Sequence, residues 1–178
     1  VCNYTGGSTQ AILVDAAADG LTLDGIVCRD TVNTQEWLIH VSVATTVTDL
    51  TIQNCNFIGL IAGSMTNSIL FAGTTSNLRL LNNHIDVDSA DSTIDHDAGI
   101  ATNALVAGNI VLNQDTTTAG YCIEFHASST GHMIQNMCSY AKNDAPVYIG
   151  EAMFWLENYG GNTAGSSGEL DPAAAAIP

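Results

Sequence analysis

Basic residues are scarce in this sequence, and their scarcity argues against two large classes of partner. Only Arg29, Arg79 and Lys142 are basic, against 18 acidic residues, so the formal net charge is −15. Nucleic acids and anionic membrane surfaces are bound through clustered Lys and Arg side chains. The composition therefore predicts neither nucleic acid nor a membrane as a partner.

Long apolar runs and paired cysteines are also missing. The sequence has no run of 18 apolar residues, which would predict a membrane span. It also has no basic segment followed by an apolar one, which would predict a signal peptide. The five cysteines are far apart and include no CxxC pair, which fits neither a disulfide framework nor a zinc site. We expect them to fill a narrow core as small apolar side chains. Because the chain begins with Val1 rather than Met, we expect that a segment was removed or that a longer polypeptide contains it.

What the sequence does contain is a strand-like phrase that returns at nearly regular intervals, with anchors at positions 25, 54, 82, 108, 136 and 158. Each copy has an apolar residue two positions before its Asn or Gly anchor, and all but one have another four positions before it. The six copies are Leu21-x-Leu23-x-Gly25, Leu50-x-Ile52-x-Asn54, Leu78-x-Leu80-x-Asn82, Ala104-x-Val106-x-Gly108, His132-x-Ile134-x-Asn136 and Phe154-x-Leu156-x-Asn158. A repeat of this length indicates a solenoid, in which each copy buries its face against its neighbours.

Two kinds of solenoid compete for this pattern. Leucine-rich repeats share the period, and Leu78-x-Leu80-x-x-Asn83-x-Ile85 fits half of their signature. The other half of such a repeat usually needs a convex side with its own leucines. Here that half holds a second strand with turns rich in Thr, Ser, Asn and Gly, which favour strands and turns over helix. The sequence therefore favours a parallel β-helix.

The segment Leu80-Leu81-Asn82-Asn83-His84-Ile85 resembles the I-x-N-N-x-I/F repeat of right-handed parallel β-helix proteins. The resemblance covers nearly the whole chain and implies an all-β fold, a right-handed parallel β-helix of about six coils. We expect residues 1–159 to form this domain, and residues 160–178 to form a Gly/Ser linker and an extended C-terminal arm. We also expect Leu23, Ile52, Leu80, Val106, Ile134 and Leu156 to stack as one internal column.

The anchors predict a structural column at one corner of the coil. Asn tolerates the left-handed backbone of a sharp corner, and Gly has no steric penalty there. Asn side chains on successive coils can also bond to each other as a ladder. We expect this corner ladder to consist of Gly25, Asn54, Asn82, Gly108, Asn136 and Asn158.

Few residues suggest chemistry. The segment 86–97 is the densest acidic cluster, and a loose Ca²⁺ site there would use Asp86, Asp88, Asp91, Asp95 and Asp97. The alternative is a solvated acidic loop, so we predict no resident cofactor. Glu124 and His126 alternate on one strand and could form a surface hydrogen bond.

The parallel β-helix family includes pectate lyases, polygalacturonases and phage tailspike depolymerases. Lyases of this kind need a basic residue near bound Ca²⁺, and hydrolases need carboxylates about 5 to 9.5 Å apart. Arg29 and Arg79 lie at different coil positions, and we find no carboxylate ladder on neighbouring coils. We therefore predict that this chain is not an enzyme and has no catalytic residues.

The chain resembles tailed-phage decoration and fibre proteins in its bare β-helix, scarce lysine and flexible terminal arm. That resemblance implies a structural protein on the surface of a virus particle that contacts other virion proteins. It also implies a homo-oligomer, with a trimer favoured, on the virion surface or otherwise outside the cell. The alternative is a secreted or cell-surface β-helix that binds or degrades carbohydrate. Exposed aromatic side chains in a row would favour this alternative.

Overall fold

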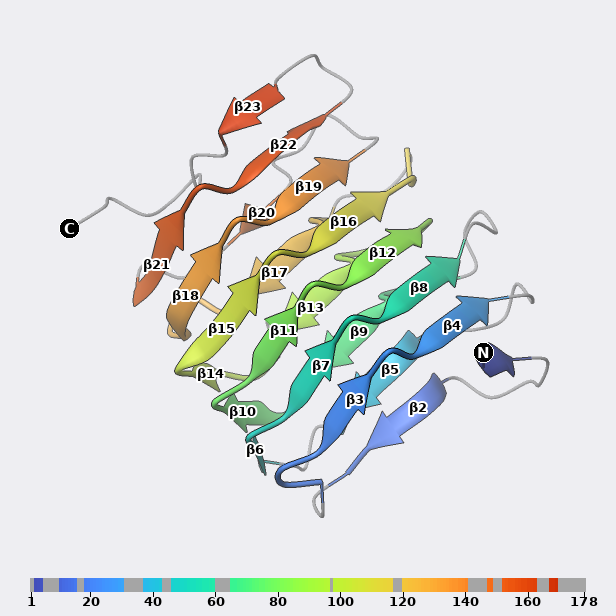
Figure 1. Ribbon diagram of the computed structural model, residues 1–178, viewed down its shortest axis with the longest axis vertical. Helices are drawn as coiled ribbons and strands as arrows, with labels where there is room; N and C mark the ends of the chain where they lie inside the picture. The colour runs from blue at the N-terminus through green and yellow to red at the C-terminus, as the bar shows by residue number, and fades with distance from the viewer. Residues whose placement is uncertain are drawn as a thin grey trace.

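The structure is a computed structural model in which residues 2–4, 10–15, 18–30, 37–42, 46–59, 65–96, 98–116, 120–140, 147–148, 152–162 and 167–169 are described. Within these ranges all regular secondary structure is β-strand. Accordingly, this part of the chain holds no helix long and apolar enough to cross a membrane. The strands stack as a parallel β-solenoid along the long axis of the molecule (Figure 1).

Each coil passes through up to four sheets, numbered here in the order in which a middle coil of the solenoid enters them. Sheet 1 contains β2 (Gln10–Val14), β5 (Trp37–Val41), β9 (Ile69–Phe71), β13 (Ile94–His96), β17 (Ile123–Phe125) and β20 (Val147–Tyr148). Sheet 2 contains β6 (Thr46–Thr48), β10 (Thr74–Ser76) and β14 (Ala101–Thr102). Sheet 3 contains β3 (Thr22–Asp24), β7 (Thr51–Gln53), β11 (Arg79–Leu81), β15 (Ala104–Ala107), β18 (Thr130–Ile134) and β21 (Ala152–Leu156). Sheet 4 contains β1 (Cys2–Tyr4), β4 (Val27–Asp30), β8 (Asn56–Gly59), β12 (His84–Val87), β16 (Ile110–Asn113), β19 (Met137–Tyr140), β22 (Tyr159–Asn162) and β23 (Ser167–Glu169).

The coil is right-handed, as predicted. From β7 and β8 at the front, the chain passes behind into β9 and returns through β10 to β11, one layer nearer the C-terminus (Figure 1). The solenoid has about four turns rather than about six. Every copy of the phrase forms a strand of sheet 3, whereas sheet 2 has described strands in three coils only. Counting copies of the phrase therefore overestimates the number of turns that pass through all four sheets.

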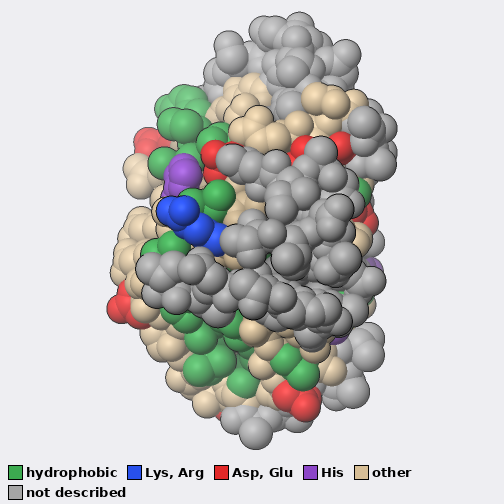
Figure 2. Space-filling model, turned by 90° about the vertical axis from the view of Figure 1, so that its right-hand side faces the viewer, with side chains coloured by type: hydrophobic (Ala, Val, Ile, Leu, Met, Phe, Trp, Pro, Cys, Tyr) green, Lys and Arg blue, Asp and Glu red, His purple; other side chains and the backbone are tan. Residues whose placement is uncertain are grey.

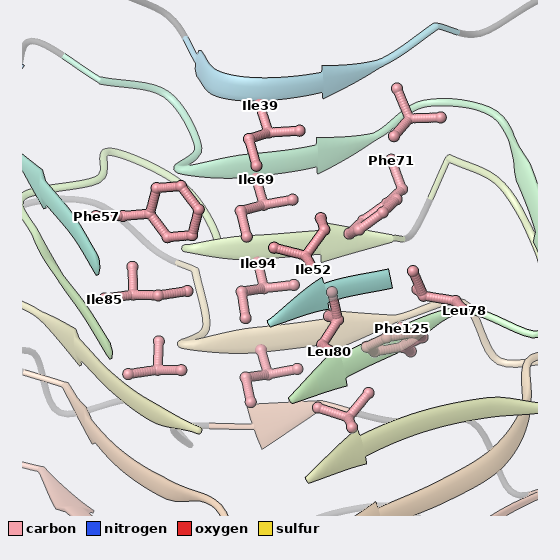
Figure 3. Packing of buried hydrophobic residues seen from close by; sticks show 14 of the residues in the cluster. Ile39, Ile52, Phe57, Ile69, Phe71, Leu78, Leu80, Ile85, Ile94 and Phe125 are labelled. Carbon is pink, nitrogen blue, oxygen red and sulfur yellow. The ribbon is translucent and has the colours of Figure 1, made fainter. Parts of the chain in front are cut away.

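The core lies between sheets 1, 3 and 4 and is built from columns of stacked side chains. Ile39, Ile69 and Ile94 occupy equivalent positions on β5, β9 and β13, and Ile52 and Leu80 face them from sheet 3 (Figure 3). All five side chains are buried. Because successive strands lie about 4.8 Å apart, like side chains pack directly on one another at every level. The repeat in the sequence is thus a repeat of core contacts.

The predicted internal column is correct for the first four strands of sheet 3 and wrong for the last two. Leu23, Ile52, Leu80 and Val106 are in register, but Val106 pairs with Met133, which pairs with Trp155. Ile134 and Leu156 therefore lie on the outer face, and Leu156 is 43% exposed. A shift of one residue in a strand moves its side chains to the opposite face.

The solenoid extends beyond the predicted end of the domain. Strand β22 begins at Tyr159 and pairs in parallel with β19, so the boundary expected between residues 159 and 160 lies inside a strand. Strand β23 then pairs antiparallel with β22 and covers the last parallel edge of sheet 4. Residues 163–166 and 170–178 of the predicted linker and arm lie outside the described residues.

Candidate functional site

Each of the middle coils turns sharply at two corners that flank its strand in sheet 3. The first corner contains Gly20, Asp49, Asn77 and Asn103, and the second contains Gly25, Asn54, Asn82, Gly108, Gln135 and Glu157, all with φ between 52° and 73°. This left-handed backbone suits Gly and Asn, which explains most of these residues. At Gly108 a Cβ atom would also collide with the amide oxygen of Asn82. Corner residues touch each other too: Asn103 donates to Asn77 at 2.8 Å, and Asn77 donates to Asp49 at 2.9 Å.

A separate ladder of asparagines is buried one residue after the second corner. It contains Asn83, Asn109, Asn136 and Asn158. The side-chain amide of Asn109 donates to Oδ1 of Asn136 at 2.9 Å and to the backbone oxygen of Leu80 at 2.9 Å. Oδ1 of Asn136 also accepts the backbone N–H of Asn109 at 3.0 Å. Each member thus supplies the donor and the acceptor that a buried coil junction requires.

The single corner ladder predicted from the sequence is therefore two columns. Gly25, Asn54, Asn82 and Gly108 occupy the second corner, whereas Asn136 and Asn158 belong to the buried ladder. The register of β15 with β18 sets Gly108 beside Gln135, not beside Asn136. Two residue pairs in the sequence, Asn82-Asn83 and Gly108-Asn109, contain the signal that separates a corner from a ladder position. Aligning the second residue of each pair would have found the ladder.

The predicted acidic segment is spread over two sheets. Asp86 lies on β12 in sheet 4 and accepts a hydrogen bond from Gln114 Nε2 at 2.9 Å. Asp91 accepts the backbone N–H of Ser92 at 2.9 Å, and Asp95 lies on β13 in sheet 1. Asp88 follows β12 and is half-buried, and Asp97 lies outside the described residues. Among the described residues, no group of three or more His, Cys, Asp or Glu side chains could hold a metal ion.

Sheet 1 does bring two carboxylates together, contrary to the expectation that no carboxylates pair on neighbouring coils. Asp95 and Glu124 are direct partners on β13 and β17, and both are half-buried on the outer face. The sequence pattern does not predict this pair, because its two residues lie a full coil apart along the chain and neither belongs to the repeated phrase. Glu124 bonds to Ser92, while His126 accepts the backbone N–H of Ser128 at 3.1 Å.

Both carboxylates of this pair are held by buried polar residues of the preceding coil. Asn67 donates to Oδ2 of Asp95 at 3.1 Å and accepts from the indole N–H of Trp37 at 3.3 Å. Ser92 Oγ donates to Oε2 of Glu124 and accepts the backbone N–H of Tyr121 at 3.1 Å. We name Trp37, Asn67, Ser92, Asp95, Tyr121 and Glu124 the sheet 1 polar cluster. The cluster offers two carboxylates, an amide, a hydroxyl and two aromatic residues on one side of the rod.

His96 is enclosed in the core between two phenylalanines. Its ring stacks on Phe71 with centroids 4.9 Å apart and on Phe125 with centroids 5.3 Å apart. Burial lowers the pKa of His96 from 6.5 to about 4, so the ring is neutral near pH 7. A neutral buried ring bonded at both nitrogens is a structural element rather than a proton-transfer group.

The remaining polar side chains that suggested chemistry are dispersed or inert. Burial raises the pKa of the Cys122 thiol to about 12, and it raises the pKa values of Cys138 and Cys55 as well. Cys28 is also buried, in agreement with the predicted role of the cysteines as core filler. Arg29 lies on β4 in sheet 4 and Arg79 on β11 in sheet 3.

Comparisons with models of known protein families, with curated proteins and with solved structures found no match. The class of this protein is therefore defined by its fold, an all-β parallel solenoid.

Proposed function

We propose that this chain is a non-catalytic structural protein of a virus particle, either a capsid decoration protein or a component of a tail fibre or spike. The observation that carries the proposal is the buried asparagine ladder. It joins four successive coils through fully bonded side chains. A column of this kind stiffens a rod without a metal or cofactor. Such a rod suits a protein that spans or covers neighbouring subunits on the outside of a particle.

The charge of the chain indicates how it attaches. With a net charge of −15, it favours a basic patch on another virion protein, and that attraction is weakened by salt. We further propose that the chain assembles with copies of itself, and we expect a trimer. Strand edges at the ends of a solenoid favour assembly, because an uncovered edge pairs readily with another chain. Strand β23 covers one such edge, that of sheet 4.

Density-gradient purification of the source's virus particles tests this function. We expect antibodies raised against the folded chain to label intact particles. Raising the salt from about 0.1 to about 1 M should release the protein, because it shortens the Debye length from about 10 to about 3 Å. Recovery of the chain with the cell envelope or the soluble fraction, and not with particles, would contradict the proposal.

A second candidate function is carbohydrate binding or degradation, and the sheet 1 polar cluster favours it. Asp95 and Glu124 are register partners on adjacent strands, whose backbones lie about 4.8 Å apart. The pair therefore places two carboxylates on one face, and glycosidases act through such a pair. Trp37 at the start of β5 and Tyr121, two residues before β17, supply two aromatic residues near them that could contact sugar rings. The first function ranks higher because both carboxylates already accept hydrogen bonds from the protein.

Asp95→Asn and Glu124→Gln variants test this second function. The measurements are the binding of neutral and uronate-containing polysaccharides and the release of reducing ends. If sugar binds at the cluster, both variants lose binding while Asp86→Asn on sheet 4 does not. If wild type releases reducing ends and either variant does not, the chain is an enzyme and the structural role is wrong.

A further inference from the structure

Large hydrophobic side chains are exposed mainly on one face of this rod. Seven are exposed among the described residues, and five of them lie on the outer faces of sheets 3 and 4 near the C-terminal end. Those five are Ile110, Met137, Phe154, Leu156 and Tyr159. Both sheets face the viewer in Figure 1, and Figure 2 shows hydrophobic side chains gathered at its upper left.

The face changes from polar to apolar along the rod at fixed strand positions. On sheet 4 the outward column reads Val27, Asn56, His84, Ile110, Met137 and Tyr159. On sheet 3 one outward column reads Thr22, Thr51, Arg79, Leu105, His132 and Phe154. The next reads Asp24, Gln53, Leu81, Ala107, Ile134 and Leu156. The same backbone therefore presents mostly polar side chains in its first coils and mostly apolar ones in its last.

We define the apolar face as Leu81, Leu105, Ala107, Ile110, Ile134, Met137, Phe154, Leu156 and Tyr159. None of these nine residues is acidic, although the whole chain has 18 acids. Glu157 lies at the corner between the two sheets and accepts a hydrogen bond from Gln135 at 2.8 Å. On the N-terminal side the charged or titratable neighbours are Arg79, His84 and the half-buried Asp86 of β12. His132 lies between Leu105 and Phe154 in their column, and Glu169 of β23 is the register partner of Tyr159. A patch whose own members are apolar and uncharged has the composition of an interface core.

We propose that the apolar face binds a second copy of this chain. Two molecules with a charge of −15 repel each other, and the repulsion is weakest where their acid-poor faces meet. None of the nine residues of the face offers an opposite charge to a basic partner. The proposal rests on the proposed function, because it specifies one surface through which copies of the structural protein associate. Two like faces meet as a two-fold pair, so this contact joins copies in pairs and does not by itself build the expected trimer.

The size of the face predicts the strength of this contact. Four coils at about 4.8 Å and about seven residues at 3.3 Å span roughly 19 by 23 Å, on the order of 400 Å² on each copy. A pair of faces buries on the order of 800 Å², which is the size of weak, reversible interfaces. We therefore expect association with a dissociation constant in the micromolar range. Salt should strengthen it by screening the repulsion between copies.

Sedimentation velocity of the full chain from roughly 1 to 200 μM, the range of weak interfaces, tests the proposal. Wild type should shift from monomer to oligomer with concentration. Met137→Glu and Phe154→Glu should shift the midpoint at least tenfold or abolish association. The matched controls are Asn56→Glu and Thr51→Glu, which place the same charge on the same two columns in the polar coils. Far-UV circular dichroism and melting curves establish that all four variants remain folded.

Three outcomes would overturn the proposal. The first is a wild-type monomer at every concentration, including one whose apolar face is covered by its own C-terminal segment. The second is association that survives both face variants. The third is equal loss in the control variants. Particle labelling distinguishes this failure from failure of the proposed function, because a monomeric chain can still be recovered on virus particles.

Discussion

Thr75 and His96 form a buried hydrogen bond across two sheets, with 2.8 Å between Thr75 Oγ1 and His96 Nε2. The other ring nitrogen of His96 lies 3.2 Å from the backbone oxygen of Gly99. Both side chains are fully buried, so the pair has no access to water. The stability of the protein should therefore depend on pH in part through this group.

The first prediction concerns the direction of that dependence. His96 has a pKa of about 4 in the folded chain, below its ordinary value of 6.5, because burial disfavours the charged ring. Between these values the unfolded chain binds more protons, so stability is complete above pH 6.5 and is lost as the pH falls toward 4. The shift corresponds to a loss of about 3 kcal/mol in the free energy of unfolding, measured by urea unfolding at pH 7 and pH 4.

Two variants test this assignment. A His96→Phe variant leaves Thr75 Oγ1 unpartnered, whereas His96→Phe with Thr75→Val should restore stability at pH 7 and remove the contribution of His96 to the pH dependence. An unchanged pH profile in the double variant would show that other groups cause the dependence.

The second prediction separates the buried ladder from the exposed corner. Asn109→Ala removes hydrogen bonds to Asn136 and to the Leu80 carbonyl and should cost about 3 kcal/mol. Asn82→Gly changes an exposed residue with φ of 55° and should alter stability by less than about 1 kcal/mol. Chemical denaturation of both variants measures the difference. Equal effects would mean that the ladder does not stabilise the coil stack.

The third prediction is that the ladder can be lengthened. Cys55 occupies the ladder position one coil before Asn83, and its backbone N–H donates to Asn83 Oδ1 at 3.0 Å. Its thiol lies 3.5 Å from the backbone oxygen of Leu23, the carbonyl that an asparagine would reach at this position. Cys55→Asn should raise stability by about 1 kcal/mol and increase the melting temperature. Cys55→Ala is the control and should lower both.

The fourth prediction tests the register of β18. Met133 is buried in the internal column, whereas the adjacent Ile134 faces outward. Met133→Ala should cost about 2 to 5 kcal/mol, and Ile134→Ala less than about 1 kcal/mol. The denaturant midpoints of the two variants show which residue lies in the internal column. The reverse order would restore the register expected from the sequence pattern.

The errors in the sequence-based interpretation have one physical source. The second corner accepts Gly, Asn, Gln or Glu, because a side chain there extends into solvent and is not enclosed by the core, so the residue changes from Asn82 to Glu157. A buried ladder position needs a donor and an acceptor on a short side chain, so Asn109 and Asn136 recur. An alignment that treats all asparagines as equivalent moves from one column to the other. The last two strands were therefore predicted one residue out of register.

No local sequence pattern predicts the carboxylate pair. Asp95 and Glu124 become partners because the coil between them has a particular length, which differs from coil to coil. The spacing between successive anchors of the phrase is not constant, so equivalence between loops cannot be counted from the sequence. Only the hydrogen-bonded register of β13 with β17 places the two on one face.

The sequence by itself determined the architecture of this protein, because a periodic strand phrase with turn residues between its copies has one way to bury its apolar side chains. It also determined that the chain is acidic and that Cys28, Cys55, Cys122 and Cys138 are buried in the core. The tertiary structure decided which neighbours share a column: the buried ladder, the enclosed His96, the pairing of Asp95 with Glu124, and the apolar face at the C-terminal coils. These depend on register between strands of successive coils, and register is set by the packing of whole coils rather than by any segment alone.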